Sequence, residues 1–104
     1  MTNRAASEVK RSEIERAVCE KFGDYCESAL KLIEKESSFN PYAVNPYSGA
    51  TGLCQSLPAS KMATHGSDYL TNVDTQLAWC YDYIQNRYKN ASLAWAFWLR
   101  NRWF

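Results

Sequence analysis

The feature that most constrains the fold is an abrupt change of pattern near residue 40. Up to Ser37, apolar residues recur at helical spacing and predict a helix over about residues 24–37. Asn40-Pro41 ends this helix, because the residue before a proline disfavours helical backbone. The segment from there to Gln55 is rich in Gly, Pro, Asn and Ser, so we expect a turn-rich loop or a short hairpin.

Glu36 falls in the last turn of that predicted helix. At about 100° per residue it lies between the positions of Ala29 and Leu32, so it continues the apolar face, whereas Lys35 points away. Apolar surroundings disfavour an ionised carboxyl and raise its pKa, which suits a general acid near neutral pH. The simpler interpretation is an ordinary glutamate at a helix end, but the polar loop that follows favours acid chemistry on a polar polymer.

The rest of the sequence also predicts helices. Periodicity and helix-start signals place them over about residues 7–22, 58–64, 72–88 and from 91 onward. Ser7 and Ser12 are alternative starts for the first helix, while Asn72 or Thr71, and then Asn90, are expected caps. The helix over residues 72–88 carries a stripe expected to be buried: Leu77, Cys80, Tyr81, Ile84 and Tyr88. We therefore expect one mainly α-helical domain over residues 1–104, with residues 1–6 as a tail.

Length, composition and charge exclude several classes of protein. The 104 residues suit one domain, and an apolar content of 46% indicates a globular rather than a disordered chain. A net charge of +1 gives no electrostatic case for nucleic acid. No stretch is apolar for long enough to predict a transmembrane helix. The four Trp and seven Tyr are typical of sugar-binding clefts, although we expect most of these rings in the core.

The four cysteines favour disulfides, because an even number in a small extracellular domain usually pairs. Cys19 and Cys26 flank a predicted turn and form the favoured local pair, and Cys54 with Cys80 is the favoured long-range pair. Three connectivities remain open, as does a set of four buried thiols, because Cys54 and Cys80 both fit core positions. His65 is the single histidine and zinc-finger spacing is absent, so the sequence predicts no metal, no cofactor and no Cys-His nucleophile.

Three motifs carry a resemblance to a known family. The first is Glu36-Ser37 with Phe39-Asn40-Pro41 and Ala43-Val44, and the second is Gly49-Ala50-Thr51-Gly52-Leu53-Cys54-Gln55. The third, Ala94-Trp95-Ala96-Phe97-Trp98-Leu99-Arg100-Asn101, departs from the family pattern, with Trp98 where tyrosine is usual and Leu99 where asparagine is usual. Over residues 22–104 the chain resembles the catalytic core of soluble lytic transglycosylases. It is also similar to the C-terminal domain of aggregation-promoting cell-wall proteins.

The resemblance implies a small lysozyme-like helical domain that cleaves peptidoglycan between N-acetylmuramic acid and N-acetylglucosamine. Glu36 would protonate the glycosidic oxygen and then act as a base. Tyr47 and Trp98 would provide platforms for sugar rings. The residues expected to bind the glycan strand are Ser37, Asn45, Tyr47, Gly49, Gln55 and Trp98.

The number of carboxylates separates two mechanisms. With Glu36 alone, the C6 hydroxyl of the sugar would attack and leave a 1,6-anhydro product, as in the lytic transglycosylases that the chain resembles. In a lysozyme-type hydrolase, a second carboxylate would assist the attack of water. Asp68 is the best candidate for that role, because Asp74 is better explained by its place in the first turn of a helix. The resemblance favours the mechanism with one acid.

A non-catalytic glycan-binding module of the same fold is the rival hypothesis. The intact Glu36 argues against it, whereas Trp98, Leu99 and the small size argue for it. The N-terminus lacks an apolar signal core, so we expect an excised domain or another export route, such as delivery within a phage particle. The expected location is extracellular, periplasmic, in the cell wall or in a phage particle. Peptidoglycan is the expected partner, without membrane insertion, of a monomer or of one domain in a larger wall-associated or phage protein.

Overall fold

The computed structural model describes residues 10–104, so the predicted tail and the predicted helix start at Ser7 lie outside the described residues. The elements follow in the order α1 (Arg11–Phe22), η2 (Gly23–Tyr25), α2 (Cys26–Ser37), η3 (Ala59–His65), α3 (Val73–Tyr88) and α4 (Ala91–Asn101). Both η segments are 3-10 helices. Between residues 10 and 104 the only β-type pairings are two isolated bridges. The expected mainly helical, small lysozyme-like fold is confirmed.

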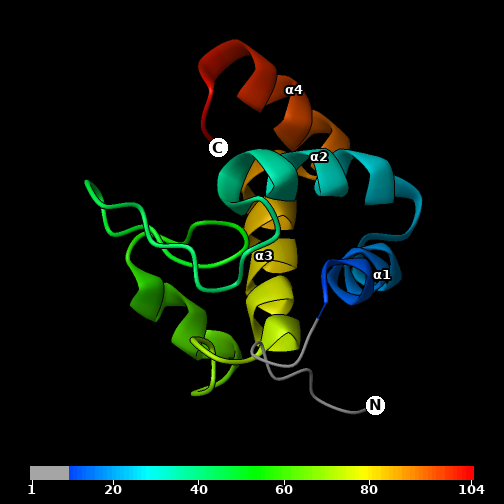
Figure 1. Cartoon of the computed structure of the whole chain (residues 1–104). Coiled ribbons are helices and arrows are strands. Elements are labelled where there is room, and N and C mark those ends of the chain that lie inside the picture. Colours follow the sequence, from blue (N-terminus) through cyan, green and yellow to red (C-terminus); the bar gives the residue numbers. More distant parts are fainter. Residues whose placement is uncertain (1–9) are drawn as a thin grey trace.

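Helix α3 is the central element of the molecule (Figure 1). It packs against α1, α4 and η3, while α2 packs against α1 and α4. In Figure 1 the long loop after α2 and η3 lie on one side of α3, and α1 lies on the other. The core between these elements contains fully buried side chains from α1, α2, the loop and α3, among them Val18, Leu32, Leu53 and Leu77.

The helix starts confirm part of the sequence analysis. Asn72 caps α3 by accepting from the backbone N–H groups of Asp74 (2.9 Å) and Thr75 (3.3 Å). Asn90 caps α4 by accepting from Leu93 N–H at 2.9 Å. The start at Ser12 is wrong, because α1 begins at Arg11 and Ser12 lies inside its first turn. The predicted buried stripe of α3 also holds, with Leu77, Cys80 and Ile84 buried and its two tyrosines half-buried.

The loop over residues 38–58 is attached to both neighbouring helices. The buried Ser37 hydroxyl of α2 donates to Leu53 O at 2.8 Å. The side chain of Gln76 in α3 is 1% exposed, accepts from Leu53 N–H at 2.9 Å and donates to Pro41 O at 3.0 Å. At Gly52, which has φ +86°, a Cβ atom would lie 2.8 Å from Gln76 Oε1, so glycine is required there. These contacts fix the turn-rich segment between α2 and α3.

Two disulfides complete this framework. Cys19 pairs with Cys26 and joins the end of α1 to the start of α2. Cys54 pairs with Cys80 and joins the loop to α3, with 26 residues of sequence separation. The structure therefore has both of the favoured pairings, and no cysteine among residues 10–104 is free.

Candidate active site

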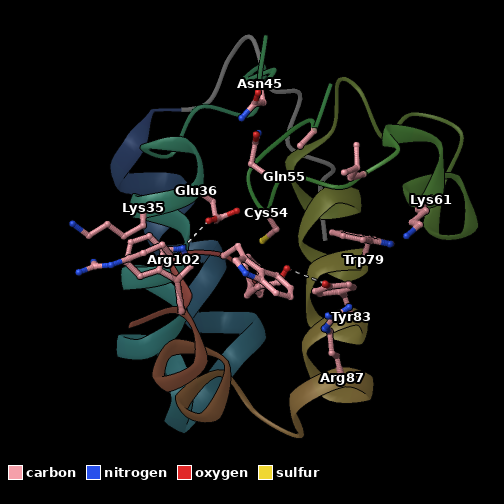
Figure 2. Close-up of a pocket in the computed structure, with 15 residues that line it drawn as sticks. Lys35, Glu36, Asn45, Cys54, Gln55, Lys61, Trp79, Tyr83, Arg87 and Arg102 are labelled. Carbon is pink, nitrogen blue, oxygen red and sulfur yellow. Dashed lines mark hydrogen bonds between the residues drawn. The ribbon is translucent and has the colours of Figure 1, made fainter. Parts of the chain in front are cut away.

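A cleft of about 550 Å³ lies between α2 and α3 (Figure 2). Helix α2 contributes Lys35 and Glu36 to it, and the loop contributes Asn45 and Gln55 among others. The opposite wall comes from α3 and η3. The C-terminal part of the chain completes the lining with Trp98, Arg102, Trp103 and Phe104. Residues that are far apart in the sequence therefore face one concave surface.

Glu36 projects into this cleft from the last turn of α2 and is half-buried (Figure 2). Burial raises the pKa of its carboxyl, and a hydrogen bond from Trp98 opposes this effect without cancelling it. Among the described residues that line the cleft, Glu36 is the only one with a carboxylate side chain. The site therefore offers one carboxyl with an increased tendency to carry a proton.

Trp98 holds the Glu36 carboxyl in place. The indole Nε1–H of this buried α4 residue donates to Glu36 Oε2 at 2.9 Å. The Trp98 ring stacks on Trp95 with 5.5 Å between ring centroids and 11° between planes. The position where the family usually has tyrosine thus provides a rigid hydrogen-bond donor to the predicted acid.

One face of α3 forms the opposite wall of the cleft. Trp79, Tyr83 and Arg87 recur every four residues and all line it (Figure 2). The rings of Trp79 and Tyr83 stack at 5.0 Å, and the Tyr83 hydroxyl donates to Phe104 O at 3.1 Å. The sequence analysis missed this face because it considered only the buried stripe of α3. The four-residue spacing of Trp79 and Tyr83 was the signal that could have revealed it.

Comparison with known proteins identifies the family. The chain matches the transglycosylase SLT domain over residues 14–99, which is most of its length and includes the first two motifs and most of the third. The chain belongs to the transglycosylase SLT domain family. This membership confirms the resemblance to lytic transglycosylases and supports peptidoglycan-related transglycosylase activity in general. Neither the curated proteins nor the solved structures gave a match.

The structure brings only some of the predicted glycan-binding residues of this SLT domain into the cleft. Asn45, Gln55 and Trp98 line it. Asn45 Oδ1 accepts from two backbone N–H groups, and Gln55 Nε2 donates to Gly52 O at 2.9 Å and to Ala43 O at 3.2 Å. Both side chains therefore also stabilise the loop, and the half-buried Gln55 has its amide nitrogen engaged.

Other predicted residues lie elsewhere. The Tyr47 ring is 97% exposed and, like Gly49, is outside the set that lines the cleft, because the turn carries both away from α3. Ser37 is buried and its hydroxyl bonds to Ile33 O and Leu53 O instead of to Glu36. The Ser37 hydroxyl is therefore engaged by the backbone of α2 and of the loop. Leu99 is half-exposed and also lies outside the cleft.

Asp68, the candidate for a second carboxylate, stabilises the start of α3. Its oxygens accept from Asn72 Nδ2 at 2.9 Å and from Thr75 Oγ1 at 2.8 Å, and the residue does not line the cleft. Asp74 lies in the first turn of α3, as expected. Asp68 thus supports the Asn72 cap and the first turn of α3 through side-chain hydrogen bonds.

The single histidine, His65, lies outside the cleft. His65 ends η3 and pairs with Asp82 at 2.5 Å and with the Thr64 hydroxyl at 2.8 Å. Among residues 10–104, no group of three or more His, Cys, Asp or Glu side chains is placed to hold a metal ion. No helix in the described part is long and apolar enough to cross a membrane.

Proposed function

We propose that this chain is a lytic transglycosylase that cleaves the bond between N-acetylmuramic acid and N-acetylglucosamine in peptidoglycan, with Glu36 as its general acid and base. The observation that carries the proposal is that Glu36 has the only carboxylate side chain among the described residues that line the cleft. Its raised pKa and its fixed contact with Trp98 support the same role. Family membership supports the reaction class.

The reaction begins with proton transfer from Glu36 to the glycosidic oxygen, whose bond to the anomeric carbon breaks. The C6 hydroxyl of the same muramic acid attacks that carbon and forms the 1,6-anhydro bond. Its proton passes to the Glu36 carboxylate, which restores the acid. No water is consumed, so one group can act in both steps as first acid and then base.

Among the residues that the structure describes, no second carboxylate side chain lines the cleft, and this favours intramolecular attack over hydrolysis. An activated water needs a carboxylate roughly 5–10 Å from the acid, and the most plausible partner, Asp68, is engaged by Asn72 and Thr75. Because the substrate lies outside the cytoplasm, we place the working protein in the cell wall, the periplasm or a phage particle.

Muropeptide analysis tests the proposal. Purified peptidoglycan is digested with the wild-type chain and with Glu36→Gln, and the products are analysed by mass spectrometry. We expect 1,6-anhydro muropeptides from the wild type and a loss of at least about 100-fold in turnover for Glu36→Gln. Glu34→Gln is the matched control, because Glu34 is on the same helix, outside this cleft, and pairs with Arg11.

Each product pattern has a distinct meaning. Reducing-end muropeptides would show that water, and not the C6 hydroxyl, attacks the anomeric carbon. Strong binding without any product would identify a glycan-binding module. Cleavage by Glu36→Gln close to that of the wild type would remove Glu36 from the mechanism.

A further inference from the structure

Residues 102–104 follow α4 and run from one wall of the cleft to the other; we call them the strap. All three line the cleft. Helix α4 ends where Arg102 takes a left-handed backbone conformation with φ +66°, which turns the chain back towards α3. The strap lies beyond residues 14–99, the part of the chain that matches the family. Its contacts are therefore additional to those of the matched domain.

One side of the strap is attached to α3. The Tyr83 hydroxyl donates to the backbone oxygen of Phe104 at 3.1 Å, and the two rings meet edge to face with 5.6 Å between centroids. The Arg87 guanidinium lies 5.5 Å from the ring centroid of Trp103. Figure 2 shows Tyr83 and Arg87 on the wall opposite Glu36. A hydrogen bond and ring contacts thus join the strap to that wall.

The other side of the strap is attached to the part of α4 that holds the predicted acid. The Arg102 guanidinium lies 5.2 Å from the centroid of a Trp98 ring, and the Trp103 ring meets Phe97 edge to face at 4.9 Å. Trp98 in turn donates its indole N–H to Glu36 at 2.9 Å. A series of contacts therefore runs from α3 through the strap and Trp98 to the Glu36 carboxyl.

We propose that the strap covers Trp98 from the cleft side, and that Tyr83 acts through the strap as a positioning residue for Glu36. The inference rests on the proposed function and adds a residue to the same site. Within the described part of the chain the strap has two hydrogen bonds, from Tyr83 and from its own backbone to Trp98 O. The bond from Tyr83 is the one that reaches α3, so its loss should free the far end of the strap.

Charged and titratable groups from α2, η3, α3 and the strap share the cleft with Glu36. They are Lys35, Lys61, Tyr83, Arg87 and Arg102, and Tyr88, outside the lining, also interacts electrostatically with Glu36. The pKa of the Glu36 carboxyl is governed by burial, which raises it, and by the smaller opposing effect of the Trp98 hydrogen bond. A loosened strap would admit water to Trp98 and the carboxyl. The pKa of Glu36 should then fall towards the ordinary glutamate value.

The pKa of Glu36 is measured directly, by NMR titration of its isotope-labelled carboxyl carbon in the wild type and in Tyr83→Phe. The substitution removes one oxygen atom and keeps the ring that stacks on Trp79. We expect a lower pKa and a turnover about two- to tenfold lower at neutral pH, which corresponds to the loss of one hydrogen bond. Tyr81→Phe is the matched control, because Tyr81 is on the same helix but outside the cleft and packs on Phe22.

Trp103→Ala tests the strap with Tyr83 intact. It removes the ring contacts with Phe97 and Arg87 and should also lower the pKa of Glu36. The double variant with Tyr83→Phe should lower it by less than the sum of the two single changes, because both act through one strap. In each variant the alkaline fall in turnover should move to lower pH. Removing the Trp98 hydrogen bond itself would raise the pKa and move this fall the other way.

An unchanged pKa of Glu36 in a folded Tyr83→Phe protein would overturn the inference, as would an equal fall in the Tyr81→Phe control. A raised KM with an unshifted pH profile would also overturn it, since that pattern makes Tyr83 a direct contact for the sugar. The NMR titration needs no substrate, so it decides the inference even if the wild-type chain releases no product. That last outcome contradicts the proposed function alone.

Discussion

At the scale of single residues, the Glu36 carboxyl is subject to two opposing influences. Burial removes water from it and raises its pKa, while the Trp98 N–H stabilises the ionised form and lowers it. The burial effect is the larger of the two. The proposed mechanism needs both protonation states in turn, so a carboxyl that is protonated readily but still able to ionise suits it.

Replacing Trp98 with Phe should move the pH profile of activity. Turnover requires protonated Glu36 and therefore falls as the pH rises through the pKa of its carboxyl. Trp98→Phe removes the hydrogen bond that lowers this pKa, so the alkaline fall in turnover should shift to higher pH. The measurement is the rate of muropeptide release as a function of pH. Trp95→Phe is the control, because Trp95 stacks on Trp98 while the bond to Glu36 comes from Trp98 Nε1. An unchanged or acid-shifted limb would contradict the assigned role of Trp98.

Helical periodicity was enough to predict the direction of Glu36, because residues within one helix are related by local geometry. The contact with Trp98 could not be predicted, since 62 residues separate the two in the sequence. For the same reason the hydrogen-bond partner of Ser37 could not be predicted. Its hydroxyl reaches a carbonyl of the loop, and that partner depends on how the loop folds back on α2.

At the scale of elements, the loop between α2 and η3 depends on α3 for its shape. Gln76 satisfies backbone groups of Leu53 and Pro41, and the Cys54–Cys80 disulfide lies one turn of α3 further on. A buried amide with several partners and a covalent bond together constrain a segment that has few pairings of its own. This attachment holds Asn45 and Gln55 at the edge of the cleft.

Asp68→Asn should retain activity within roughly tenfold of the wild type, well short of the loss expected for a catalytic group. The residue lies outside the cleft lining and accepts hydrogen bonds from Asn72 and Thr75 at the start of α3. Losing one of these bonds should lower the free energy of unfolding by about 1 kcal/mol. Muropeptide release and thermal unfolding are measured in parallel. A folded Asp68→Asn protein as inactive as Glu36→Gln would point to hydrolysis assisted by a second carboxylate.

Element types were predictable because each helix carries its own apolar pattern or cap, as at Asn72 and Asn90. The cleft wall on α3 was not predictable from the sequence, because Trp79 is mostly buried by its neighbours and yet also lines the cleft. A ring of this kind has the same sequence signature as a core residue. Its second role depends on the placement of α2 and the C-terminal residues.

At the scale of the whole molecule, net charge concealed the character of the cleft. A total of +1 gave no electrostatic case for nucleic acid, and it did not reveal that four cations line one surface with Glu36 as the only acidic side chain. Acidic residues outside the cleft, such as Glu27 and Glu34, balance the sum. The positions of charges in space depend on the fold, so the charge distribution of the cleft is a property of the tertiary structure.

The molecule is small, with extents of 33 × 32 × 23 Å, so its core is limited. An unfavourably buried carboxyl such as that of Glu36 should therefore have a measurable effect on stability. Burial raises the pKa of Glu36 in the folded state above the ordinary glutamate value, so folding favours the protonated form. The sign follows from linkage: the wild type loses stability as the pH rises from the ordinary pKa of about 4.3 through the raised pKa, and then no further from this group.

Glu36→Gln should therefore be more stable than the wild type at neutral pH. Gln is uncharged at every pH and can still accept the hydrogen bond from Trp98 through its carbonyl oxygen. The gain should stay below about 1 kcal/mol, because the half-buried carboxylate is still partly solvated. It should vanish below the ordinary glutamate pKa, where both proteins are neutral at this position. Thermal unfolding between pH 3 and pH 8 measures the difference, with Glu34→Gln as the control for an exposed ion-paired glutamate. A difference that grows towards acid pH would mean that the fold stabilises the carboxylate, which is incompatible with Glu36 as the resting acid of the reaction.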